Sequence, residues 1–186
     1  EQFRNLEIYD DLSKGKEKLC ISQGQLIENV ILEAEKAWKG ETQVDNILLT
    51  APTGSGKSLL FQLPAIYLGK EYNLLTIVVS PLKALIVDQV ESLQELGYTR
   101  VAYASSDLSP EQKMEVYRQV REGEIDLFYL SPELLLSYDI KHFVGERRIG
   151  LVVVDEAHTV TTWGKEFRVD YWFLGRYLNT LKQTLG

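Results

Sequence analysis

The sequence predicts an α/β fold, in which one mainly parallel sheet is covered by helices on both faces. Short runs rich in Val, Ile and Leu alternate along the chain with segments whose apolar residues recur at helical spacing. The runs are apolar at nearly every position, as expected for parallel strands that are buried on both sides. A length of 186 residues with 45% hydrophobic content suits a single domain with its own core.

The elements follow from these runs and from local start and stop signals. Five strands are expected, at 46–50, 74–80, 100–104, 125–130 and 150–155. Helices are expected at 24–38, 58–68 and 82–96, from 110 to 122, from 132 onward, and at 171–185. Ser109-Pro-Glu-Gln112 is a capping box with Pro at the first helical position, and Ser131-Pro-Glu133 begins a helix in the same way. The charged residues 1–20 are expected to be a lead-in to a domain that spans 21–186.

Composition and charge limit the function classes. A net charge of -7 and a pI near 5.0 argue against binding of nucleic acid through bulk positive charge, although a narrow groove of amides and hydroxyls remains open. Cys20 is the single cysteine, so an intrachain disulfide is excluded. No apolar stretch is long enough to cross a bilayer, and we expect a cytoplasmic protein without a membrane partner. The chain begins without Met and stops in a helical pattern, which favours a piece of a longer protein.

Residues 51–58, Ala-Pro-Thr-Gly-Ser-Gly-Lys-Ser, form a Gly-rich turn between an expected strand and an expected helix, as a phosphate-binding loop requires. The predicted nucleotide-binding residues are Pro52, Thr53, Gly54, Ser55, Gly56, Lys57 and Ser58. Lys57 would reach the β- and γ-phosphates, and the Ser58 hydroxyl would hold Mg²⁺. Ala51 stands where the strict pattern has Gly. An accidental Gly-rich turn is therefore the competing interpretation, which the Lys-Ser pair disfavours.

An acidic pair follows the apolar run 151–154, where a buried strand would end and ligands bind in open α/β sheets. Asp155 would hold Mg²⁺, and Glu156 would polarise the attacking water as a general base. Taken alone, such a pair is more often a helix cap or a solvated turn, but Lys57 reverses these odds. His158 is open between packing, capping and relay roles.

Cys20 and His142 have no partners at metal-ligand spacing, so no metal other than Mg²⁺ is expected. The basic residues near 145 are interpreted as a solvated turn: Lys141, His142, Arg147 and Arg148.

The order of motifs resembles the first RecA-like domain of superfamily 2 helicases of the DEAD/DEAH-box type, and more narrowly the RecQ-like branch. The resemblance covers about residues 21–178, and the segments that carry it are 51–58 (motif I), 80–89 (motif Ia, Ser-Pro-Leu-Lys-Ala-Leu-Ile-Val-Asp-Gln), 104–107, 129–133 (motif Ib, Tyr-Leu-Ser-Pro-Glu) and 155–158 (motif II, Asp-Glu-Ala-His). It implies a three-layer RecA-like P-loop NTPase domain that uses ATP and Mg²⁺. Lys57, Asp155 and Glu156 are the catalytic residues by this resemblance.

The segment 162–171 is similar to the aromatic-rich loop that couples single-stranded DNA to ATP hydrolysis in RecQ helicases. Trp163 and Phe167 would stack on bases beside Arg168, although ordinary core aromatics are the alternative. The loop departs from the family pattern at three positions: Lys165, Glu166 and Val169.

The resemblance also assigns Ser80, Pro81, Gln89, Ser105 and Ser131 to the path of one DNA strand, with helix capping as the alternative for the serines. It assigns reading of the adenine edge to the glutamine of motif 0. Gln25 occupies that place in this chain, and Gln23 is its rival.

The implied function is the ATP-binding half of an ATP-dependent RecQ-like DNA helicase or translocase. Its partners would be single-stranded DNA, with duplex and forked DNA as further candidates, and a second RecA-like domain of the parent chain. Gly175-Arg176 lacks the context of the arginine motif that this second domain supplies, so we expect weak hydrolysis by these residues alone. The alternatives are an RNA-acting helicase, a nucleotide-gated scaffold module that hydrolyses little, and a P-loop phosphotransferase.

Overall fold

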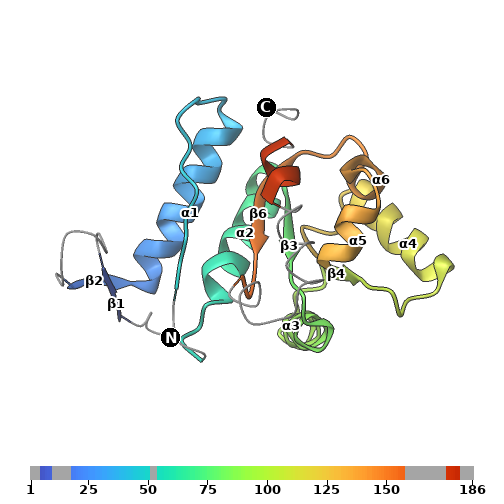
Figure 1. Cartoon of the computed structure of the whole chain (residues 1–186), viewed down its shortest axis with the longest axis horizontal. Coiled ribbons are helices and arrows are strands. Elements are labelled where there is room, and N and C mark those ends of the chain that lie inside the picture. The colour runs from blue at the N-terminus through green and yellow to red at the C-terminus, as the bar shows by residue number, and fades with distance from the viewer. Residues whose placement is uncertain (1–4, 10–17, 51–53, 158–174, 181–186) are drawn as a thin grey trace. The chain divides into compact units, whose positions relative to one another are not determined.

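The computed structural model describes residues 5–9, 18–50, 54–157 and 175–180. The chain divides into two compact units, residues 1–67 and 68–186. Figure 1 labels their helices and strands. Among the described residues, no helix combines the length and apolar character that crossing a membrane requires.

The first unit contains a hairpin and a long helix. Strand β1 (Asn5–Tyr9) pairs antiparallel with β2 (Lys18–Ser22), and helix α1 (Gln23–Trp38) follows directly. Helix α2 (Leu59–Tyr72) begins in this unit, and Leu60 packs with Leu26 and Ile27 of α1 in a small apolar cluster. The expected helix at 24–38 is thus confirmed, whereas the hairpin, which extends from the expected lead-in to Ser22, was not predicted.

The expected strand at 46–50 is wrong for the structure as described. These residues have no strand hydrogen bonds, and Leu48 is 87% exposed. An apolar run of this kind favours a strand, but a strand exists only where a neighbouring strand supplies backbone partners. The described part of the first unit offers residues 46–50 no such neighbour.

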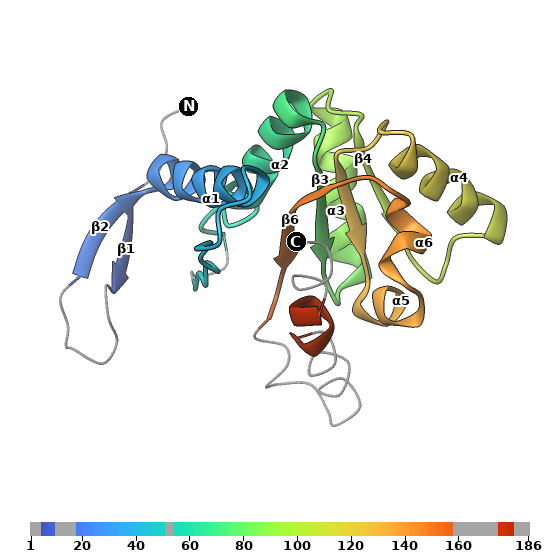
Figure 2. The same cartoon turned by 90° about the horizontal axis from the view of Figure 1, so that it is seen from above.

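The second unit is built on a parallel sheet (Figure 2). Its strands are β3 (Leu75–Val79), β4 (Val101–Ala104), β5 (Leu127–Leu130) and β6 (Ile149–Val154), in the order β4-β5-β3-β6. All three pairings are parallel. β3 and β5 are buried along their whole length, as their continuous apolar sequence predicted.

Helices cover both faces of this sheet. On one face, the main core joins Phe128 of β5 to Tyr117 of α4 (Pro110–Arg121), Leu135 of α5 (Pro132–Ser137) and Phe143 of α6 (Ile140–Val144). Helix α3 (Lys83–Glu95) lies against the other face. The α/β prediction is therefore confirmed, although the short helix α6 was not foreseen.

The helix caps predicted at Ser109 and Ser131 are present in the structure. The Ser109 hydroxyl accepts a hydrogen bond from the Gln112 amide, and the Gln112 side chain accepts one from the Ser109 amide. Ser131 caps α5 through the amide of Leu134. Gly97 and Gly123 adopt positive φ after their helices.

The basic turn is not simply solvated. The Arg147 side chain is only 5% exposed and pairs with Asp126, whose side chain is 2% exposed, at 2.9 Å. Arg100 binds the same carboxylate with Nε 2.6 Å from Oδ2. The sequence could not reveal this cluster, because the paired residues are 21 and 26 positions apart.

Candidate functional site

The phosphate-binding loop has a backbone that suits an anion. Gly54 and Gly56 adopt φ values of +78° and +80°, the left-handed region that turns backbone amides toward a common point. Lys57 and Ser58 follow, and the amide of Leu60 donates to the Lys57 carbonyl at 3.0 Å as the helix begins. Ser55 Oγ is buried and has no hydrogen-bond partner among the described residues. This hydroxyl has the hydrogen-bonding capacity that a polar ligand of the loop would use.

Gln23, rather than Gln25, touches this loop. The Gln23 side chain is buried, and its Nε2 donates to the Ser55 carbonyl at 2.9 Å. A Cβ on Gly56 would lie only 2.6 Å from the same Nε2, so a larger residue there would displace the glutamine amide. The Gln25 side chain instead accepts from the Ser22 amide at 2.9 Å and completes the capping box of α1. The two glutamines therefore have different positions, which their spacing alone did not separate.

The second unit gathers four candidate side chains at one edge of its sheet. Ser80, Ser105, Ser131 and Asp155 each come directly after a strand: β3, β4, β5 and β6. The last residues of the strands are in register, with Val79 paired to Leu130 and Val154, and Ala104 paired to Leu130. In the sheet order the row therefore reads Ser105, Ser131, Ser80, Asp155. The three serines are at most 5% exposed. We call this set the carboxyl-edge row.

Backbone hydrogen bonds hold the row in place. The Ser80 amide donates to the Leu130 carbonyl at 3.0 Å, and the Asp155 amide donates to the Val79 carbonyl at 2.9 Å. Ser131 is engaged as the cap of α5, as the capping alternative proposed. Ser80 Oγ is buried without a hydrogen-bond partner among the described residues, so capping does not account for this hydroxyl.

The acidic pair is tightly organised. The Glu156 amide donates to Asp155 Oδ1 at 2.9 Å, which orients that carboxylate. Glu156 has φ +50°, a conformation that costs a non-glycine residue about 1–2 kcal/mol. Strain of this kind persists where the surrounding structure enforces it, and it is concentrated at functional sites.

Motif Ia and motif Ib meet on the α3 face of the sheet. Gln89 of α3 accepts a hydrogen bond from the Tyr129 hydroxyl of β5, and Pro81 is half-buried just before α3. Tyr129 was not singled out as a site residue, because its apolar neighbours favour an ordinary core tyrosine.

Several predicted site residues lie outside the described part of the chain: Pro52, Thr53, His158, Trp163, Phe167 and Arg168. Lys57 and Ser58 belong to the first unit, whereas Asp155 and Glu156 belong to the second. Among the described residues, no cluster of His, Cys, Asp or Glu forms a metal site by itself. Ser58 and Asp155 nevertheless carry the hard oxygen donors that Mg²⁺ prefers.

Comparison with known proteins places these features in a family. The family described as DEAD/DEAH box helicase matches residues 27–185. Among similar curated proteins, the ATP-dependent DNA helicase RecQ of Synechocystis sp. is 41% identical over 141 residues, which cover 75% of this chain and 28% of the relative. RecQ of Bacillus subtilis is 38% identical over 126 residues, covering 68% of this chain and 20% of the relative. The ATP-dependent helicase SGS1 of Saccharomyces cerevisiae is 37% identical over 134 residues, covering 69% of this chain and 9% of the relative.

A solved structure agrees on the fold. The crystal structure of the DUF1998 helicase MrfA bound to DNA and AMPPNP covers 86% of this chain, with a TM-score of 0.54 and 20% identity, and the match spans 23% of that protein. The chain likewise spans 28% or less of the three relatives described above. The matched range 27–185 contains the phosphate-binding loop, the carboxyl-edge row and the acidic pair, and the chain therefore belongs to the DEAD/DEAH box helicase family, with RecQ helicases among its relatives.

Proposed function

We propose that residues 21–186 are the first RecA-like domain, and thus the ATP-binding part, of an ATP-dependent RecQ-like DNA helicase or translocase. The observation that carries this proposal is the carboxyl-edge row, because it aligns Asp155 with three serine side chains at one edge of a parallel sheet. That edge is where open α/β sheets bind their ligands. Asp155 as a metal ligand and a strand-binding path can therefore share this edge of the sheet.

The nucleotide would be held by the phosphate-binding loop. The amides around Gly54 and Gly56 would cradle the phosphates, and Lys57 would neutralise the β- and γ-phosphate oxygens. Ser58 and Asp155 would hold Mg²⁺, which supplies charge neutralisation at the phosphoryl group when bound. Gln23 supports the loop from outside through the Ser55 carbonyl, and Gln25 stays a candidate for the adenine edge.

Glu156 would position and deprotonate the attacking water. Its backbone amide donates to the Asp155 carboxylate, which leaves the Glu156 carboxylate to act separately from that metal-binding group. Metal binding and water activation are thereby divided between adjacent residues. In superfamily 2 motors the arginines for the transferring phosphate come from a second domain, which would be the partner of this chain. We therefore expect these residues alone to bind ATP and to hydrolyse it slowly.

Single-stranded DNA would run along the carboxyl-edge row. Serine hydroxyls and helix-start amides contact the sugar–phosphate backbone without reading sequence, which suits a motor that must move along any strand. The net charge of -7 requires that the grip be local. Trp163, Phe167 and Arg168 would add stacking and phosphate contacts by the RecQ resemblance.

Nucleotide binding and hydrolysis by the 186-residue chain test this proposal. Binding of a fluorescent ATP analogue with Mg²⁺ should be lost in Lys57→Ala and retained in Glu156→Gln. Lys39→Ala removes an exposed lysine of the same unit and should leave binding unchanged, which makes it the matched control. Hydrolysis by the parent protein should rise with single-stranded DNA and should collapse in Glu156→Gln.

The outcomes separate the alternatives. Stimulation by RNA but not by DNA would favour an RNA-acting helicase. Tight nucleotide binding with a parent rate that Glu156→Gln does not change would favour a scaffold module. Transfer of phosphate to an acceptor other than water would indicate a phosphotransferase.

A further inference from the structure

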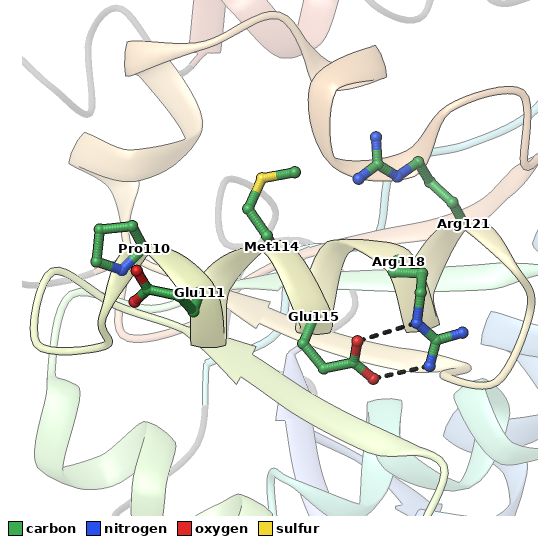
Figure 3. A pocket seen from close by; sticks show the side chains of 6 residues that line it. All are labelled: Pro110, Glu111, Met114, Glu115, Arg118 and Arg121. Carbon is green, nitrogen blue, oxygen red and sulfur yellow. Dashed lines mark hydrogen bonds and ion pairs between the residues drawn. The ribbon is translucent and has the colours of Figure 1, made fainter.

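The basic side chains of the second unit fall into clusters that differ in net charge. On α4, Arg118 binds Glu115 through two hydrogen bonds of 2.7 and 3.0 Å, and it also contacts Glu122 and Glu124. Figure 3 shows the two hydrogen bonds between Arg118 and Glu115 beside a cavity of about 650 Å³ that Met114 and Arg121 also line. This surface carries two arginines, Arg118 and Arg121, and four carboxylates, Glu111, Glu115, Glu122 and Glu124, so it is negative. It therefore has little attraction for a phosphate.

The basic side chains of the second cluster bind groups of the protein itself. Arg100 and Arg147 share the Asp126 carboxylate, and both also donate to backbone carbonyls. Asp126 directly precedes β5, so this cluster lies at the amino end of that strand, opposite the carboxyl-edge row.

The third cluster differs from the others in its balance of charges, because lysines outnumber carboxylates among its contacts. Lys83 is the first residue of α3, and its Nζ contacts Ser106 Oγ and lies 2.9 Å from Asp107 Oδ1. Lys113 of α4 reaches the same loop, with its Nζ 3.4 Å from the Ser106 carbonyl. Two lysines therefore face one carboxylate at this loop. The pKa of Asp107 is lowered, first by the hydrogen bond from Lys83 and further by the charges of both lysines.

This cluster lies at the carboxyl edge of the sheet. Ser106 and Asp107 directly follow Ser105, the end member of the carboxyl-edge row, and the Asp107 amide donates to Ser105 Oγ at 3.4 Å. The Lys83 and Asp107 side chains are 47% and 71% exposed. An exposed pair of this kind contributes little to stability, so another anion can compete with the carboxylate for the lysine at small cost.

We propose that Lys83 and Lys113 form a binding site for a phosphodiester group of the nucleic-acid backbone, in which Asp107 is a resident counter-ion that the phosphate displaces. This inference rests on the proposed function, because it assigns the DNA path one cationic contact beyond the serines. Ser106 would donate its hydroxyl to the same phosphate. The site extends the row outward from Ser105 and supplies the local positive charge that the acidic chain otherwise lacks there.

The test is binding of a fluorescein-labelled oligothymidylate to the 186-residue chain, followed by anisotropy at several salt concentrations. Lys83→Ala should weaken binding about fivefold and should lower the slope of log affinity against log salt by about 0.7, the value for one phosphate contact on a single strand. Lys113→Ala should act in the same direction. Asp107→Asn should tighten binding several-fold, because it removes the competing anion.

The opposite signs are the decisive feature. If the Lys83–Asp107 pair only stabilised the loop, Lys83→Ala and Asp107→Asn would both weaken binding, and the inference would be overturned. Lys70→Ala is the matched control: Lys70 is an exposed lysine near the C-terminal end of α2, which leads into the amino end of β3. It should change neither affinity nor slope. If the wild-type chain binds the oligothymidylate and Lys70→Ala and Lys83→Ala lose the same affinity, the lysine site is refuted and the proposed function is not. If the wild-type chain does not bind the oligothymidylate at all, the DNA-binding proposal is refuted as well.

Discussion

The hydroxyl of Tyr129 donates a hydrogen bond to Oε1 of Gln89 over 2.9 Å. Tyr129 is fully buried in β5, and Gln89 is half-buried on α3. The bond joins two segments 40 residues apart that both resemble nucleic-acid motifs of helicases. It therefore fixes the side chain of a candidate DNA contact from within the core.

Tyr129→Phe should weaken binding of single-stranded DNA about fivefold, because Gln89 loses the bond that orients it, which is worth about 1 kcal/mol. The salt slope should stay unchanged, since no charge is removed. A double-mutant cycle with Gln89→Ala checks the mechanism by anisotropy. If the two effects simply add, Tyr129 does not act through Gln89.

Gly56→Ala should weaken binding of a fluorescent ATP analogue and should also destabilise the first unit. The alanine would pay for a φ of +80° and would displace Gln23 from the Ser55 carbonyl, together about 2–3 kcal/mol. Gly40→Ala is the control, because Gly40 has the same φ of +80° and no described atom within 4 Å of its added Cβ. It should lower thermal stability alone. Equal nucleotide affinities in both variants would contradict the supporting role of Gln23.

Glu156→Gly should be more stable than Glu156→Ala by about 1 kcal/mol in chemical denaturation. Both variants lack the carboxylate, but only alanine keeps the Cβ that strains a φ of +50°. Both should lose hydrolysis in the parent protein. Higher stability of the alanine variant would show that this backbone conformation is not strained.

Asp126→Asn should lower the free energy of unfolding by about 3–5 kcal/mol. The substitution leaves the Arg147 guanidinium buried without its counter-charge, and Arg100 loses the same partner. Glu146→Gln is the control, since the Glu146 side chain is 93% exposed and lies 3.9 Å from Lys141. It should change stability by less than about 1 kcal/mol. Similar losses in the two variants, measured by denaturant unfolding, would refute the importance of the buried cluster.

Tyr98→Phe should reduce the loss of stability at alkaline pH. Burial raises the pKa of Tyr98. The Asp126 carboxylate accepts a hydrogen bond from the Tyr98 hydroxyl at 3.2 Å, and its negative charge raises that pKa further. The pKa of Tyr98 in the folded protein exceeds its unfolded value near 10. The contribution of the protonated Tyr98 to folding stability is therefore complete below about pH 10 and is lost as pH rises toward the folded pKa. Unfolding free energies between about pH 9 and 11 should therefore fall less steeply in the variant. Parallel curves would contradict this assignment.

The helix starts and the parallel strands were predictable because their signals are local. A capping box needs only Ser109 and Gln112, three positions apart, and a buried parallel strand needs only a continuous apolar run such as 75–79. The candidate members of the carboxyl-edge row could also be named in advance, since each polar residue directly follows such a run. Their alignment required the strand register, which is a pairing between distant segments.

The sequence by itself determined the fold class, the family and the residue types of the candidate site. The tertiary structure decided which glutamine supports the phosphate-binding loop, where Arg147 is buried, that residues 46–50 form no described strand, and that Lys83 meets Asp107. The physical reason is the same in each case. Backbone periodicity and caps depend on neighbours in sequence, whereas the partner of a polar side chain depends on which distant segment packs beside it.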